Sequence, residues 1–396
     1  MPMSFSHQTL GQQVHFGVGN LTRDVRSEVT RHQAQQILLI ASGSAVAAAD
    51  ELHATLRIAH RIDGARQHVP VEDVESACDA ATQVQADLIL CVGGGSAIGL
   101  GKAVALKTRA PIIAVPTTYA GSEATNVWGV TEAGAKATGT DDVVLPAGVV
   151  YDAELVRDLP DELASASGMN ALAHCIDSLW GPRADPLNAL LAGEAMGALR
   201  RGMSPLAAGP GRPGNPGGSG NSGGSAGPGT SGAADSPGAE LQARQQLQYG
   251  AYLAATAFAS AGSGLHHKIC HMLGGSFGLP HAQTHAVLLP HVLAFNLPQA
   301  PAAGERIAQA LDAADALTGL ERLRTQIGAP RALRDHGLKE ADLDRAAGLI
   351  LEVVPASNPR KMTSTDAAEL IRAAFSGADA SALERPVRHL EGSRSP

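Results

Sequence analysis

The sequence predicts a two-part fold, with an α/β domain over residues 1–155 and an all-helical domain over residues 156–396. In the first part, short β-branched and aliphatic runs alternate with helical patterns, which is typical of a parallel sheet covered by helices. After about residue 155 the strand signals stop, and apolar residues recur at helical spacing toward the end of the chain. These two observations predict an α/β nucleotide-binding domain joined to a helical one.

The individual elements follow from the same patterns. Strands buried on both faces are continuous apolar runs, whereas helices place apolar residues three or four positions apart. The expected strands span residues 36–40, 86–94, 111–117 and 148–152, with helices between them over 44–60 and 71–85. The expected helices of the second part span residues 160–180, 186–208, 240–276, 302–327 and 339–353.

A glycine-, proline- and serine-rich run at 209–238 interrupts the second part. Such a segment cannot bury enough apolar surface to offset its ordering entropy, so a flexible loop is expected. Helical patterns over 186–208 and 239–261 flank it, which places the loop inside a helical hairpin. An inert surface insertion is favoured over a lid or a partner-binding tail, because loop closure costs little more as a loop lengthens.

Composition limits the class of partner. The net charge of −8 argues against a nucleic-acid or anionic-membrane surface, although a local pocket can still bind an anion. No apolar run approaches the ~18 residues of a membrane span. The four cysteines stand far apart, which favours reduced thiols. We therefore expect a cytoplasmic enzyme with a small-molecule substrate.

A glycine-rich turn follows the second expected strand, in the sequence CVGGGSAIGLGKAVA at 91–105. Glycines let the backbone approach a ligand, and the helix that begins near Ser96 directs its N–H groups at an anion such as a pyrophosphate. Gly94, Gly95 and Ser96 are therefore predicted cofactor contacts. Tight packing of strand against helix is the alternative, since the spacing differs from the G-x-G-x-x-G fingerprint.

A second turn, VPTTYAGSEAT at 115–125, follows the next strand. Thr117, Thr118 and Ser122 offer hydroxyls at the carboxyl end of the sheet, where open α/β folds bind ligands. A dinucleotide across both turns is the favoured interpretation. The strand at 36–40 is followed by Ala41–Gly43, which offers no carboxylate to bind the ribose 2′-hydroxyl of NADH or to repel the 2′-phosphate of NADPH. The enzyme is therefore expected to use both cofactors.

Histidines concentrate in one stretch: residues 264–291 hold six of the fifteen in the chain. His267 and His271 share one helix face because they are four residues apart. His281 follows a predicted helix end and can fold back toward that pair, and His174 is a candidate fourth member. His266 is expected to point elsewhere with a structural role. For His285 and His291, pocket lining and packing both stay open.

Four segments together resemble the iron-containing alcohol dehydrogenase superfamily, and within it the maleylacetate reductases. They are the two turns, the helix GMNALAHCID at 168–177 and the block HHKICHMLGGSFGLPHAQTHAVLLPH at 266–291. The resemblance implies a dehydroquinate synthase-like fold with the active site between the two domains. It also implies an NADH or NADPH cofactor and a homodimer.

Metal-dependent members of that superfamily bind a divalent ion through an aspartate and three histidines. Carried onto this chain, those positions are Asn170, His174, His267 and His281. An amide is a poor substitute for a carboxylate, because it brings no negative charge to neutralise the ion. The maleylacetate reductases share this kind of replacement, so no metal is expected, although a residual ion at the three histidines stays open.

The resemblance further implies reduction of the conjugated C=C of maleylacetate to 3-oxoadipate. His271 and His281 are expected to stabilise the enolate and donate the proton, with His267 in support. Asn170, His174 and Lys268 are expected to contact the dicarboxylate substrate, and Arg360 or Lys361 are weaker candidates for its carboxylates. The alternatives are a metal-dependent alcohol dehydrogenase, a dehydroquinate synthase-like lyase and a non-catalytic binding protein.

Overall fold

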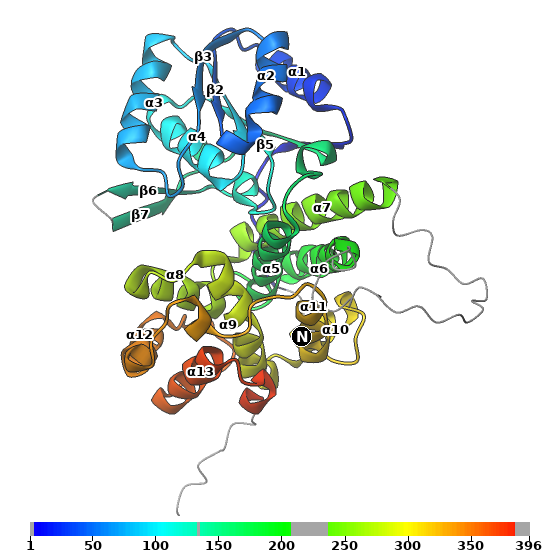
Figure 1. Cartoon of the computed structure of the whole chain (residues 1–396), viewed down its shortest axis with the longest axis vertical. Helices are drawn as coiled ribbons and strands as arrows, with labels where there is room; N and C mark the ends of the chain where they lie inside the picture. Colours follow the sequence, from blue (N-terminus) through cyan, green and yellow to red (C-terminus); the bar gives the residue numbers. More distant parts are fainter. Residues whose placement is uncertain (1–3, 133–134, 207–236, 385–396) are drawn as a thin grey trace, which may run out of the picture.

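The computed structural model describes residues 4–132, 135–206 and 237–384 of the chain. Apart from its last two residues, the predicted insertion at 209–238 lies outside the described residues. An α/β part and a helical part lie one beside the other along the long axis of the molecule (Figure 1). The predicted fold class is confirmed.

A six-stranded parallel sheet forms the centre of the α/β part, in the order β1-β8-β5-β4-β2-β3. The four predicted strands are confirmed, whereas the two edge strands were missed because their half-buried residues give no continuous apolar run. The strands are β1 (Gln13–Gly17), β2 (Ile37–Ala41), β3 (Ile58–Asp63), β4 (Leu88–Gly93), β5 (Ile112–Pro116) and β8 (Gly148–Asp152). Since β3 occupies the end of the helix predicted at 44–60, that end was wrong.

Helices cover both faces of this sheet. Within β2, Leu38 and Ile40 pack into the core beneath α3 and α4, while Leu39 packs into the opposite core. Because both faces are buried, the strand residues are apolar without alternation. The covering helices are α1 (Leu21–Arg31), α2 (Val46–Thr55), α3 (Val71–Gln83) and α4 (Gly95–Thr108).

An antiparallel hairpin of β6 (Val127–Glu132) and β7 (Ala135–Thr140) also belongs to the α/β part and was not predicted. It lies on the side of this part that faces the helical part (Figure 1). Its residues are half-buried or exposed, so they carry a weak apolar signal.

The helical part is formed by nine α-helices among the described residues, and no strand follows Asp152 there. The predicted helix at 240–276 is two helices, since Gly262 adopts the left-handed conformation (φ +83°). The prediction at 302–327 likewise divides in two, and α9 and α13 were not among the predicted helices. The helices are α5 (Asp161–Ser178), α6 (Pro186–Leu206), α7 (Pro237–Ala261), α8 (Leu265–Phe277), α9 (His281–Asn296), α10 (Pro301–Ala310), α11 (Ala316–Gln326), α12 (Leu343–Val353) and α13 (Ser364–Ser376).

Helix α7 lies along the boundary between the two parts (Figure 1). Gln248 Nε2 donates to the carbonyl of Asp152 at the end of β8 (3.3 Å). Gly121, in the loop after β5, packs so closely on Ala255 that a Cβ at this glycine would lie 2.6 Å from the alanine Cβ. The carboxyl ends of the strands therefore rest on the helical part. Within the described residues, no helix has the length and apolar character needed to cross a membrane.

Candidate functional site

The carboxyl ends of β2, β4 and β5 meet at one edge of the sheet, where the strand order reverses between β2 and β4. A Cβ on Gly93 would lie 2.5 Å from Ser42 Oγ, and one on Gly94 would lie 2.9 Å from the Thr118 methyl carbon. At Gly95 an added Cβ meets nothing within 4 Å. The strand ends are thus close-packed, with open space beside Gly95. Such switch points are where open α/β sheets bind ligands.

Helix α4 begins at Gly95, in the middle of this edge. Its N-cap residue, Gly94, offers no side chain to the first-turn N–H groups, and the first turn holds no acidic residue. Those N–H groups are therefore available to an anion. Thr117 Oγ1 is buried without a hydrogen-bond partner, and Ser96 is half-buried in the first turn of the helix. The predicted cofactor residues gather at one edge, and their role stays a prediction.

A buried lysine holds the loop that follows β5. Lys102 Nζ donates to the carbonyls of Ser122 (2.6 Å), Thr125 (2.7 Å) and Val127 (2.9 Å). Burial lowers the pKa of Lys102 to about 7. Ser122 is therefore positioned through its backbone. The sequence analysis missed Lys102, although a lysine within the apolar run GLGKAVAL is a recognisable signal.

Five histidines form a continuous row of rings across α5, α8 and α9. The ring centroids of His174 and His267 are 4.8 Å apart, and those of His267 and His285 are 4.9 Å apart. The row continues from His285 to His281 (4.2 Å) and from His281 to His271 (6.1 Å). The structure thus brings together the four histidines that the sequence singled out, and it adds His285.

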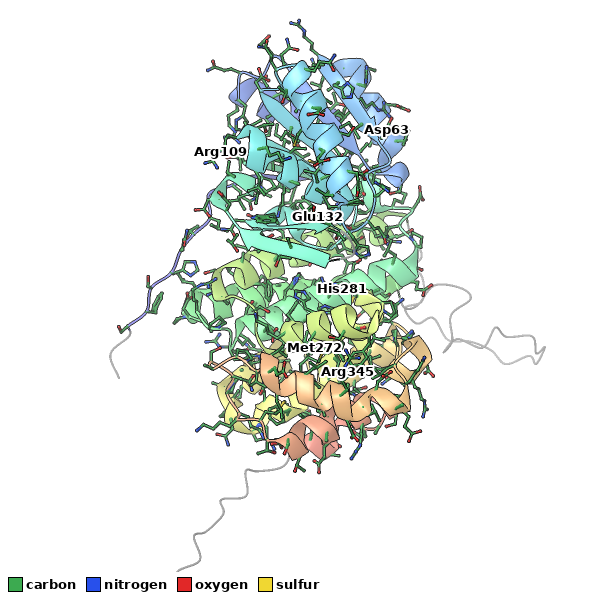
Figure 2. The ribbon with its side chains drawn as sticks, turned by 90° about the vertical axis from the view of Figure 1, so that its left-hand side faces the viewer. Asp63, Arg109, Glu132, Met272, His281 and Arg345 are labelled. Carbon is green, nitrogen blue, oxygen red and sulfur yellow. The ribbon has the colours of Figure 1, made fainter. Side chains whose placement is uncertain are left out.

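His266 packs beside this row, against His267 and His285, and burial divides the six histidines into two groups. We call His174, His266, His267 and His285 the inner histidines, because each is buried, and His271 and His281 the outer histidines, because both are exposed. Figure 2 shows His281 at the edge of the helical part that faces the α/β part. Desolvation lowers the pKa of all four inner imidazoles below the usual histidine value. The inner histidines are therefore neutral at neutral pH.

Asp177 fixes one of the inner rings. His267 Nδ1 donates to Asp177 Oδ2 (2.7 Å), and the backbone N–H of His267 donates to the same oxygen (3.1 Å). This leaves His267 Nε2, buried and without a hydrogen-bond partner, as a lone-pair acceptor. Burial raises the pKa of Asp177, and the electrostatic interaction with His266 and the hydrogen bonds from neighbouring groups oppose that rise. The sequence analysis missed Asp177, although Asn170, His174 and Asp177 stand at i, i+4 and i+7 on one helix face.

Three atoms at the position where the resemblance implies a metal are buried without a hydrogen-bond partner: Asn170 Oδ1, His174 Nδ1 and His267 Nε2. Buried polar atoms normally have partners, so these atoms indicate where a ligand or water binds. None of these three donors carries a charge, and the Asp177 carboxylate acts only from behind His267, through Nδ1. Moreover, the ligand atoms of His174, His267 and His281 do not all lie within 4.8 Å of one another. As placed, the three histidines therefore do not surround a single ion position.

The structural role expected for His266 remains a prediction. Its Nε2 lies 3.0 Å from His285 Nδ1 and 3.5 Å from Cys270 Sγ, so it belongs to the histidine cluster. The i, i+4 spacing of His266 and Cys270 was the available signal. His291 lies farther along α9 and is buried, and its pKa falls to about 4.

The cations predicted to bind the substrate carboxylates do not lie among the buried histidines. Lys268 is exposed on α8. Arg360 is buried, its Nη2 donates to Asp366 Oδ1 (2.9 Å), and its guanidinium lies over the ring of Phe295 (4.3 Å). Arg360 therefore stabilises the helical core, and its guanidinium is already paired with Asp366.

The family described as iron-containing alcohol dehydrogenase matches residues 11–153, and the Fe-containing alcohol dehydrogenase family, C-terminal, matches residues 233–375. A maleylacetate reductase from Cupriavidus pinatubonensis is 41% identical over 371 residues, which cover 92% of this chain and 95% of the relative. The chain belongs to the iron-containing alcohol dehydrogenase family.

Solved structures of this family have the same fold. An iron-containing alcohol dehydrogenase from Corynebacterium glutamicum is 46% identical with a TM-score of 0.86, and covers 97% of this chain and 100% of that one. A maleylacetate reductase from Agrobacterium tumefaciens is 34% identical with a TM-score of 0.84, and covers 95% and 99% of the two chains. Both kinds of enzyme are therefore relevant to the function of this member of the family.

Proposed function

We propose that the protein is a maleylacetate reductase that uses NADH or NADPH to reduce the conjugated C=C of maleylacetate to 3-oxoadipate. Similarity to maleylacetate reductases over most of the chain supports the substrate. The observation that carries the proposal is Asn170, whose amide oxygen, among neutral imidazoles, stands at the superfamily's metal position. A substrate that needs no Lewis acid fits such a site.

The conjugated ketone explains how the reaction can proceed without a metal. A bound nicotinamide cofactor supplies the hydride, which adds to the carbon β to the ketone and gives an enolate. The outer histidines His271 and His281 are the proposed donors to the enolate oxygen, because exposure allows them to carry a proton. One of them then transfers a proton to the neighbouring carbon, and solvent returns it.

The inner histidines have a different proposed role. Neutral His267 keeps its one N–H on Asp177, so its Nε2 is an acceptor and cannot stabilise an anion. We propose that it orients a protonated outer histidine or a water molecule, and that Asn170 and His174 contact the substrate. Exposed Lys268 remains the proposed partner of a substrate carboxylate.

We propose that both cofactors serve, with Gly94, Gly95, Ser96, Thr117, Thr118 and Ser122 around the dinucleotide. Ser42, the residue after β2, lies against Gly93 and carries no charge that would repel a 2′-phosphate. A preference of more than about a thousandfold, about 4 kcal/mol, would contradict this assignment. Steady-state rates with each cofactor measure it.

The competing function is that of a metal-dependent alcohol dehydrogenase, which the Corynebacterium glutamicum relative favours. The deciding assay follows NADH oxidation with maleylacetate, before and after exhaustive chelation, in wild type and in Asn170→Asp. We expect turnover that survives chelation and does not improve in the variant. Chelator-sensitive turnover that Fe²⁺ restores, or faster alcohol oxidation by Asn170→Asp with Fe²⁺, would favour the dehydrogenase instead.

We further propose that the enzyme is a cytoplasmic homodimer with no nucleic-acid or membrane partner. The acidic net charge and the family resemblance support this proposal. Light scattering on the purified chain should give twice the monomer mass, and a monomeric mass would contradict it.

A further inference from the structure

A second group of donors lies beside the proposed site. His266 and Cys270 stand one turn apart on α8, and His285 faces them from α9. Their ligand atoms all lie within 4.8 Å of one another. Among the described residues, they form the one such group of three or more His, Cys, Asp or Glu side chains. We call these three residues the His–His–Cys cluster.

The spacing of the three atoms is close to that of a metal site. His266 Nε2 lies 3.0 Å from His285 Nδ1 and 3.5 Å from Cys270 Sγ. With Zn–N bonds of about 2.0–2.1 Å and a Zn–S bond of about 2.3 Å, tetrahedral ligand atoms lie roughly 3.3–3.6 Å apart. Two of the three distances are therefore close to those of a metal site, the third pair lies within 4.8 Å, and an ion would replace the mutual hydrogen bond of the two imidazoles.

The chemistry of the donors also suits zinc. Thiolate and imidazole are the ligands that Zn²⁺ takes in proteins, whereas Mg²⁺ and Ca²⁺ take oxygen. Asp177 accepts from the backbone N–H of His266 (3.4 Å), which places a carboxylate behind one ligand. The Cys270 thiolate would offset one of the two charges of the ion, and the Asp177 carboxylate lies at the start of α8, where it accepts from the backbone N–H groups of His266 and His267.

The cluster is separate from the superfamily's metal position. None of its three residues is Asn170, His174, His267 or His281. All three side chains are at most 2% exposed, so an ion there would contact protein on most sides. It would join α8 to α9 through His285, whose ring also packs on His267 and His281.

We propose that the His–His–Cys cluster binds one Zn²⁺ through His266 Nε2, Cys270 Sγ and His285 Nδ1, with a fourth, exogenous ligand. The binding is independent of the proposed reductase activity.

Cobalt substitution tests the proposal on the full-length, reduced and metal-free protein, without substrate or cofactor. Co²⁺ should bind at one equivalent with a thiolate-to-metal charge-transfer band in the near ultraviolet, and Zn²⁺ should displace it. Cys270→Ser should abolish the band, and His285→Gln should weaken zinc binding by about 100-fold or more. Zinc should also raise the Tm of the wild type but not of either variant.

Two controls locate the ion. Cys175→Ser changes a buried cysteine outside the cluster and should keep the band, and so should His174→Gln at the superfamily's position. Absence of a thiolate band in the wild type would overturn the proposal. A band that survives Cys270→Ser, or one that His174→Gln removes, would do the same. If Cys270→Ser does not fold, Cys270→Ala and His285→Gln decide by the same measurements. Maleylacetate turnover tests the proposed function separately, because no substrate is present here.

Discussion

The sheet edge at β2, β4 and β5 and the histidine cluster are built from different parts of the chain. At the edge, backbone and small residues determine the shape, and Gly93 and Gly94 leave no room for a Cβ. In the cluster, imidazoles from three helices determine the electrostatics, and burial separates four neutral rings from two exposed ones. Substitutions at the edge should therefore change cofactor affinity, whereas substitutions in the cluster should change turnover.

The largest expected effect is at an outer histidine. His281→Ala should lower kcat by about 10²–10⁴-fold, the usual scale for a lost general acid or oxyanion donor, with KM for NADH nearly unchanged. Steady-state kinetics with maleylacetate measure both parameters. Glu132→Gln, on the hairpin that faces this side (Figure 2), is a surface control that should leave both unchanged. If His281→Ala raised KM for NADH and left kcat unchanged, the histidine cluster would affect cofactor binding in the way expected of the sheet edge.

A smaller effect is expected at Asp177. Asp177→Asn removes the charge that holds His267 Nδ1 and should lower kcat by about 10–100-fold, the scale for a lost partner behind a functional histidine. The pH–rate profile should shift as well, because the orientation and protonation of the ring change together. If only Tm falls while the profile of the folded variant is unchanged, Asp177 has a purely structural role.

At the edge, two adjacent glycines give a matched pair. A Cβ at Gly95 would meet no protein atom within 4 Å, so Gly95→Ala should leave Tm unchanged. If the pyrophosphate approaches the backbone at this position, KM for NADH should rise roughly tenfold in the variant, which is about 1.4 kcal/mol. Gly94→Ala should also lose about 1–3 kcal/mol of stability, because its Cβ would press on Thr118. Unchanged KM in folded Gly95→Ala would place the cofactor elsewhere.

The smallest effect tests whether burial keeps histidines of this fold neutral. The pKa of His291 is lowered to about 4, so the unfolded chain takes up its proton first as the pH falls below about 6.5. Stability should therefore fall between about pH 6.5 and pH 4, by at most about 1.4 kcal/mol per pH unit from this group. Denaturant unfolding should show a shallower fall in His291→Gln, with activity at pH 7 unchanged. Equal slopes would mean that His291 is charged in the folded state.

Much of the fold could be predicted from apolar patterns, because strands buried on both faces and helices with one apolar face leave a clear sequence signal. β2 and β8 are examples. The edge strands β1 and β3 left no such signal, since their side chains are only partly buried. The break after α7 depends on one left-handed glycine, Gly262, and in a run of alanines a single glycine is compatible with a continuous helix.

The candidate site was predictable where its residues share one helix face, as His267 and His271 do. The contacts of His266 could not be predicted in this way, because they depend on the packing of α8 against α9, which brings His266 Nε2 close to His285. Asp177 and Lys102 were missed for a related reason: each acts by binding backbone groups of a segment distant in sequence. Contacts of that kind follow from tertiary packing and leave little trace in local spacing.

The rate at which Lys102 becomes accessible also measures the opening rate of the loop at the sheet edge. Its amine is 1% exposed and donates to three carbonyls of the loop at 122–127, so an acylating reagent in solution cannot reach it while the loop is closed. Modification must therefore wait for a local opening, and at high reagent concentration its rate becomes the opening rate of the loop. Mass spectrometry of the acylated Lys102 over time thus reports how often the loop at the proposed cofactor edge opens, without an engineered probe.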